Sequence, residues 1–281
     1  MVFVFLMMNT YLHNIIWCIF FCACNSPIEH QPQHIPLPKI DPVQQQDPIP
    51  LGLQKIVAAY PSQQLSASSN HLIWSDGSTS LYQDTIPQKS FEQLLNQPDL
   101  EDQMAMVYTK GKNYKIPSRN QDPGRIRVED FFLKMYGKNK EAVMQQLVEI
   151  DFLGTKLKVT RINGIDKKLT KIAQELALYP ELKPYLENVG GSFNWRTIAG
   201  TNRLSTHSFG MTIDINIKYS NYWRWAVKDK TENGKRPIIY KNRIPLQIVE
   251  IFENNGFIWG GKWYHYDTMH FEYRPELLID L

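Results

Sequence analysis

All three cysteines of this 281-residue chain lie within its first 24 residues, at positions 18, 22 and 24. Neither a disulfide nor a zinc site with cysteine ligands can therefore stabilise the rest of the chain. A fold of this length must depend on a hydrophobic core, and 43% of the residues are hydrophobic against 21% charged. This composition is ordinary for a globular domain, and it excludes a disordered chain and a polytopic membrane protein.

The cysteines lie in or beside an apolar stretch at 15–24, which polar, proline-rich sequence follows at once. The stretch is too short for a membrane span and has the length of a signal-peptide core, although residues 1–24 contain no lysine or arginine. We expect residues 1–24 to be a signal peptide, with export to the periplasm or cell envelope. Phe21-Cys22-Ala23-Cys24 resembles a relaxed lipobox, in which Cys24 would carry a lipid anchor; cleavage by ordinary signal peptidase is the alternative.

Residues 25–50 contain seven prolines and three consecutive glutamines. Proline lacks the amide donor and fixes φ, so this segment is predicted to be an extended, solvated tether. We expect an accessory α+β region at 51–151, with a β-hairpin at 71–82 closed by Asp76-Gly77. Its expected helices begin at the capping box of Ser90 and Gln93 and cover 129–136 and 139–150. The segment 122–125 is predicted to be a turn without a chemical role.

Residues 152–281 are predicted to form the main α+β domain. The amphipathic helices expected there run from Asp166 to a point before Pro180 and from Pro245 to Gly256. Strands are expected at 157–162, 193–196, 211–217, 257–259 and 270–273. The predicted fold class is therefore α+β, with a small antiparallel sheet flanked by helices and an N-terminal accessory region.

Chemistry-bearing side chains concentrate in the last third of the chain. Six residues separate His207 from Asp214, and Gly210 among them permits a turn before an alternating strand. His207 can then return over the sheet face that displays Asp214, and His270 enters a later predicted strand. A catalytic zinc site needs three protein ligands and one open position for water. We predict that His207, Asp214 and His270 bind Zn²⁺.

Each of three further side chains near these ligands has two possible roles. Asp267 lies three residues before His270, where a carboxylate can act as the general base toward a metal-activated water. It could instead hydrogen-bond a ligand imidazole. His265 either lines the cleft or faces solvent, and Glu272 either braces a zinc histidine or lies on the sheet surface.

Ser205-x-His207-x6-Asp214 followed by Asp267-x-x-His270 resembles the zinc D-Ala-D-Ala carboxypeptidase family, over about residues 155–275. That family includes the D,D-dipeptidases of vancomycin resistance and phage endolysins. The aspartate at the base position and the segments 257–263 and 269–272 are most similar to its L-alanyl-D-glutamate peptidase branch. The resemblance implies an α+β zinc fold and hydrolysis of cell-wall stem peptides. It also implies an upstream arginine that binds a substrate carboxylate or the oxyanion, matched here by Arg196, with Arg203 as the alternative.

The resemblance leaves the cleaved bond open, between an L-Ala-D-Glu endopeptidase and a D,D-carboxypeptidase. An alternative from another class is a non-catalytic cell-wall-binding envelope protein with a structural zinc site. The expected partner is the peptidoglycan stem peptide, and the expected state is a monomer. A net charge of only +3, without a basic stripe, argues against a nucleic-acid partner.

Overall fold

A computed structural model of the chain describes residues 48–227 and 238–281. The predicted signal peptide, Cys24 and residues 25–47 of the predicted tether lie outside the described residues. Within the described ranges, no helix is long and apolar enough to cross a bilayer.

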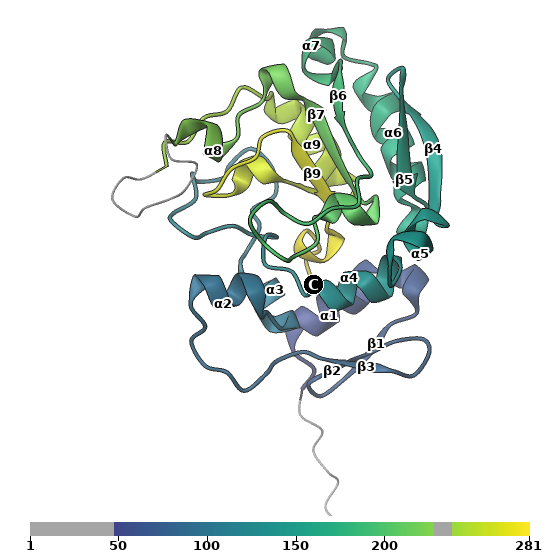
Figure 1. The fold of residues 1–281 in the computed structure, drawn as a ribbon, viewed down its shortest axis with the longest axis vertical. Coiled ribbons are helices and arrows are strands. Elements are labelled where there is room, and N and C mark those ends of the chain that lie inside the picture. Colours follow the sequence, from purple (N-terminus) through teal and green to yellow (C-terminus); the bar gives the residue numbers. More distant parts are fainter. Residues whose placement is uncertain (1–47, 228–237) are drawn as a thin grey trace, which may run out of the picture. The chain divides into compact units, whose positions relative to one another are not determined.

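A four-stranded antiparallel sheet lies at the centre of the described fold, in the order β6-β7-β9-β8 (Figure 1). Its strands are β6 (Val189–Gly191), β7 (Thr212–Asn216), β8 (Phe257–Trp259) and β9 (His270–Tyr273). The register between β7 and β9 sets Asp214 directly opposite His270 and Ile213 opposite Phe271. The predicted α+β class is confirmed, as are the strands predicted at 211–217, 257–259 and 270–273.

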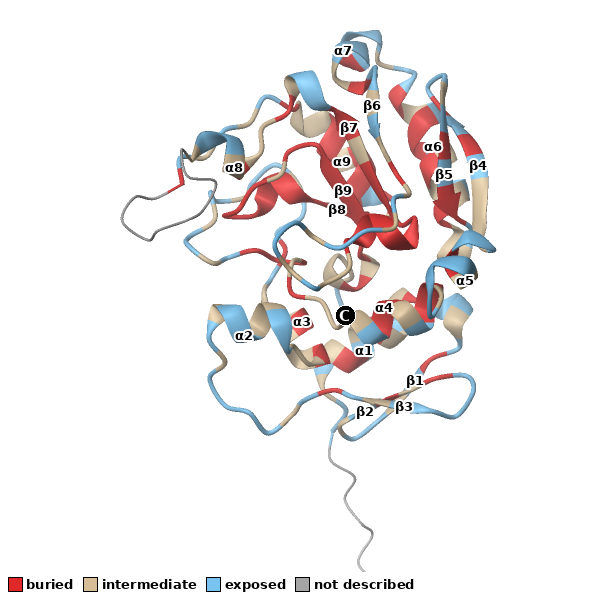
Figure 2. Ribbon diagram, in the orientation of Figure 1, coloured by how far each residue is buried: buried red, intermediate tan, exposed pale blue. Residues whose placement is uncertain are grey.

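The two central strands separate apolar from polar side chains because successive residues of a strand point to opposite faces. Ile213, Ile215 and Phe271 belong to the hydrophobic core, and the ring of Phe271 stacks on Phe252 of helix α9 (Leu246–Asn254) with 4.0 Å between centroids. Asp214, His270 and Glu272 alternate with these core residues along the same two strands. The sheet is buried throughout its centre (Figure 2). Its polar face is therefore a sheltered place for ionisable groups.

Helices and two smaller sheets surround this centre. Helix α6 (Ile165–Leu176) presents Leu169, Ile172 and Leu176 to the core, as its predicted amphipathic pattern requires. It packs against α9 and against the hairpin of β4 (Leu147–Phe152) and β5 (Thr155–Thr160). The remaining elements are α1 (Leu51–Ala59), β1 (Ser66–Ser68), β2 (His71–Ile73), β3 (Thr79–Leu81), α2 (Phe91–Asn96), α3 (Leu100–Ala105), α4 (Glu129–Tyr136), α5 (Lys140–Met144), α7 (Lys183–Leu186) and α8 (Trp223–Ala226).

One continuous hydrophobic core includes residues from helix α1 through strand β9. Leu53 and Ile56 of α1 belong to the same cluster as Phe271. The predicted boundary between the accessory region and the main domain, at 151–152, lies inside β4. The division at that point stays a prediction.

Two elements differ from the sequence-based expectation. The helix predicted at 139–150 ends at Met144, and the chain enters β4 at Leu147, where Ile150 pairs with Leu157 of β5. The strand predicted at 193–196 is not formed; strand β6 lies earlier, and the amide of Asn194 donates to the carbonyl of His207. The hairpin closed by Asp76-Gly77, the Ser90 capping box and α4 are confirmed.

Replacing Phe252 with alanine should lower the free energy of unfolding by about 3–5 kcal/mol, because it leaves a cavity against Phe271 in a fully buried position. Denaturant unfolding followed by circular dichroism measures this loss. The matched control is Leu178→Ala, since Leu178 is 74% exposed and should change stability by less than about 0.5 kcal/mol. Equal effects of the two substitutions would contradict the packing described.

Candidate metal centre

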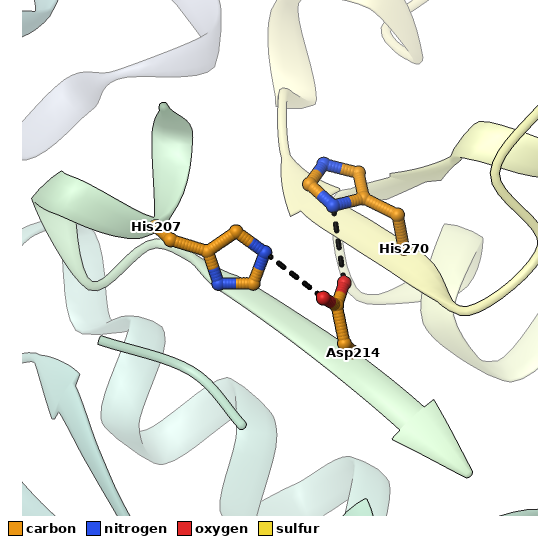
Figure 3. A group of neighbouring side chains, drawn as sticks. All are labelled: His207, Asp214 and His270. Atoms are coloured by element: carbon orange, nitrogen blue, oxygen red, sulfur yellow. Dashed lines mark hydrogen bonds and ion pairs between the residues drawn. The ribbon is translucent and has the colours of Figure 1, made fainter. Parts of the chain in front are cut away.

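The structure brings the three predicted metal ligands together. His207 lies in the 3₁₀ turn Thr206–Phe209 that precedes β7, Asp214 lies in β7, and His270 begins β9. The carboxylate of Asp214 lies between the two imidazoles (Figure 3). Its Oδ2 is 3.2 Å from His207 Nε2 and its Oδ1 is 3.2 Å from His270 Nδ1. One ligand atom from each residue lies within 4.8 Å of the others, so the group could hold a metal ion.

Hydrogen bonds on the far side of each imidazole orient these ligand atoms. His207 Nδ1 lies 2.6 Å from the carbonyl oxygen of Ser192, which can only accept, so Nδ1 donates. His270 Nε2 lies 2.9 Å from Glu272 Oε2 and donates to that carboxylate. In a neutral imidazole the other nitrogen then carries a lone pair, and here these are Nε2 of His207 and Nδ1 of His270. This is the arrangement by which proteins fix metal-binding histidines.

The donor set fits zinc. Two imidazole nitrogens and a carboxylate oxygen are ligands that zinc takes in catalytic sites, and one such atom from each of the three residues lies within 4.8 Å of the others. Burial alone raises the pKa of the Asp214 carboxyl, but the facing nitrogens of His207 and His270, when they carry protons, outweigh burial and hold that pKa well below its usual range. A bound cation would take the place of those protons. Asp214 therefore remains anionic, as a cation-binding carboxylate must.

The predicted base lies beside this group, in the wall of the same cavity of about 410 Å³. Burial, and then the negative charge of Asp214, raise the pKa of Asp267 to about 7. Its Oδ1 is buried and makes no hydrogen bond to any described residue. A carboxylate with an unpaired oxygen and a pKa near neutrality is suited to proton transfer at neutral pH.

The two arginines considered from the sequence occupy different places. Arg196 is exposed and lines the cavity that holds Asp267 and the three ligands. Its Nη1 donates to the carbonyl of Thr197 at 3.3 Å. Arg203 does not line that cavity; it lines a larger neighbouring one. The positions favour Arg196 for the role that the resemblance implies.

Glu272 connects the candidate metal ligands to two arginines that the motifs did not predict. The carboxylate is fully buried and accepts from Arg127 Nη2 at 2.6 Å, from Arg274 Nη1 at 3.2 Å and from Thr206 Oγ1 at 3.1 Å. Burial raises its pKa, but Arg127, His270 and Arg274 outweigh burial and hold it well below the usual range. Of the two interpretations left open for Glu272, the structure favours the brace for His270.

His265 also lines the cavity and is 7% exposed, so the cleft-lining interpretation is confirmed. Its Nδ1 lies 2.5 Å from Oδ2 of the fully buried Asp122, whose Oδ1 accepts from the main-chain amide of His265 at 2.8 Å. The predicted turn is present, and it contacts the cavity wall; the expectation that it has no chemical role stays a prediction. Arg125, from the same turn, lines the cavity as well. No spacing rule links these positions, because 143 residues separate Asp122 from His265.

Residues 199–273 match the family model described as D-alanyl-D-alanine carboxypeptidase. The match confirms the resemblance seen in the two motifs. It includes all three candidate ligands and Asp267, and it begins after Arg196. It supports a metallopeptidase of the carboxypeptidase type. Comparisons with curated proteins and with solved structures found no match.

Replacing Glu272 with glutamine should weaken Zn²⁺ binding 10- to 100-fold, because His270 loses the charged acceptor that orients it. Competition with a zinc-binding dye measures the affinity, and circular dichroism reports whether the fold is retained. Glu149→Gln removes an exposed carboxylate from β4 and serves as the control. An unchanged affinity in a folded Glu272→Gln protein would show that this carboxylate does not support the site.

Proposed function

We propose that the protein is a zinc-dependent peptidase that hydrolyses peptidoglycan stem peptides. One observation carries the proposal: His207, Asp214 and His270 can hold a metal ion in the cavity that Asp267 lines, and all four lie within the stretch that matches the peptidase family. The resemblance to the L-alanyl-D-glutamate peptidase branch favours an endopeptidase, with D,D-carboxypeptidase activity as the second form of the same chemistry.

The chain's own residues account for proton transfer and charge stabilisation. Bound to the three ligands, zinc would polarise the scissile carbonyl and acidify a water molecule. Asp267, whose buried Oδ1 makes no hydrogen bond to any described residue, accepts the proton of the attacking water. The protonated Asp267 then donates to the leaving amine. Arg196, at the exposed side of the cavity, stabilises the developing oxyanion or binds a substrate carboxylate.

The cavity wall favours an anionic substrate. Arg125, Arg127, Arg196 and Arg224 all line it, against Asp214 and Asp267. Stem peptides carry several carboxylates, which guanidinium groups bind in a bidentate manner. We further propose that the protein acts outside the cytoplasm, as the predicted signal peptide requires, and that a lipid on Cys24 anchors it to the membrane.

Replacing Asp267 with asparagine should lower kcat by about 10²- to 10⁴-fold while zinc remains bound, because the amide cannot accept a proton and Asp267 is not a predicted ligand. Zinc content by mass spectrometry and peptide hydrolysis are measured on the same preparation. Asp280→Asn, at an exposed position, is the control. Loss of zinc from the Asp267→Asn protein would reassign this residue to the metal.

Incubating the purified protein with muropeptides should release fragments whose masses identify the cleaved bond. Cleavage after L-Ala indicates the endopeptidase, and release of a single D-Ala indicates the carboxypeptidase. Chelation should abolish either activity, and added Zn²⁺ should restore it. Zinc binding without any product would instead support the non-catalytic cell-wall-binding alternative.

A further inference from the structure

A second cavity, of about 770 Å³, adjoins the candidate metal centre. The loop at 198–204, helix α2 with the residues that follow it, and the beginning of α4 contribute to its wall. Arg127 and Ile198 line both this cavity and the one that contains Asp267. A substrate that extends beyond its scissile bond therefore has room to continue into the second cavity.

Arg203 is the unusual side chain of this wall. Its guanidinium makes no hydrogen bond or ion pair with any described residue, and its Nε is buried. Arg203 is only partly buried, and an arginine drawn partly out of water is commonly paired with a carboxylate. Here Glu129, on the same wall, instead accepts from the main-chain amide of Leu204 at 2.7 Å. The donors of Arg203 thus remain available to a ligand.

Neighbouring positive charges also favour an anionic ligand at Arg203. Burial, and then the positive charges of Arg127 and Arg125, lower the pKa of its guanidinium to about 10, against the opposing effect of Glu129. Arg127 cannot relieve the repulsion by moving away, because it is bound to Glu272 through both Nε and Nη2. The two other carboxylates on the wall, Glu92 and Asp130, are exposed to solvent, which screens them.

We propose that Arg203 forms a carboxylate-binding subsite, in which an acidic residue of the substrate peptide is held away from the scissile bond. The inference rests on the proposed peptidase function and adds to it a preference for acidic stem peptides. A planar guanidinium with free donors binds a carboxylate bidentately, in a geometry that an amide cannot reproduce. Arg203 is then a specificity residue, and Arg196 keeps the role at the reacting carbonyl.

The test compares two stem pentapeptides that differ only at the glutamate, one with its free carboxylate and one with the carboxamide. The wild-type protein should show a KM at least tenfold lower for the acid. Arg203→Gln should raise the KM for the acid about tenfold, so that the two peptides become equal within about twofold. Arg203→Lys keeps the charge but loses the planar fork, and should fall between the two. Arg161→Gln removes an exposed arginine that lines neither cavity, and should preserve the wild-type discrimination.

Two results would overturn the inference. Equal KM values for the two peptides with the wild-type protein would show that no carboxylate is recognised at this position. A loss of kcat by 10²- to 10³-fold for both peptides in Arg203→Gln would assign Arg203 to the oxyanion instead.

Binding of the same peptides to the Asp267→Asn protein, measured by calorimetry, separates this inference from the proposed function. If the wild-type protein hydrolyses neither peptide, the proposed function fails. Tighter binding of the acid that disappears in the Arg203→Gln, Asp267→Asn double variant would then still support the subsite. Equal binding of acid and amide would overturn it, whether or not the wild-type protein hydrolyses them.

Discussion

The candidate metal centre depends on one buried carboxylate remaining ionised. Glu272 is fully buried, and it stays charged because Arg127 and Arg274 donate to it from two sides. Removing one partner of such a buried cluster leaves an uncompensated charge, which is strongly destabilising. Arg274 extends the cluster to Glu276, which accepts from the hydroxyl of Tyr60 at 2.6 Å. The orientation of His270 is thereby tied to the residue that directly follows α1.

This connection joins the accessory region to the walls of the candidate metal centre. Three residues of the segment that precedes α4 contribute to the site. Asp122 contacts His265, Arg125 lines the cavity, and Arg127 donates to Glu272. The family match, at 199–273, contains none of them. The matched stretch therefore contains the candidate ligands and the proposed base, and the residues before it supply much of the cationic wall.

The sequence predicted what depends on short-range patterns. The spacing of His207 and Asp214 and the position of His270 at the last strand were sufficient to predict three side chains that the structure brings together, because register and turn geometry follow from neighbouring residues. Arg127 and Asp122 could not be found in this way, since their partners lie 145 and 143 residues away. The helix predicted over 145–150 was wrong because that prediction also ignored a distant partner. Val148 and Ile150 favour a strand once β5 is present to pair with them.

The direct pairing of Asp214 with His270 in β7 and β9 has a consequence for how such chains can diverge. Adding or deleting one residue between a ligand and its strand neighbours would turn that ligand toward the α9 side, among the aromatic rings. Insertions should accumulate in the connections around the sheet, and the two central strands should keep their spacing.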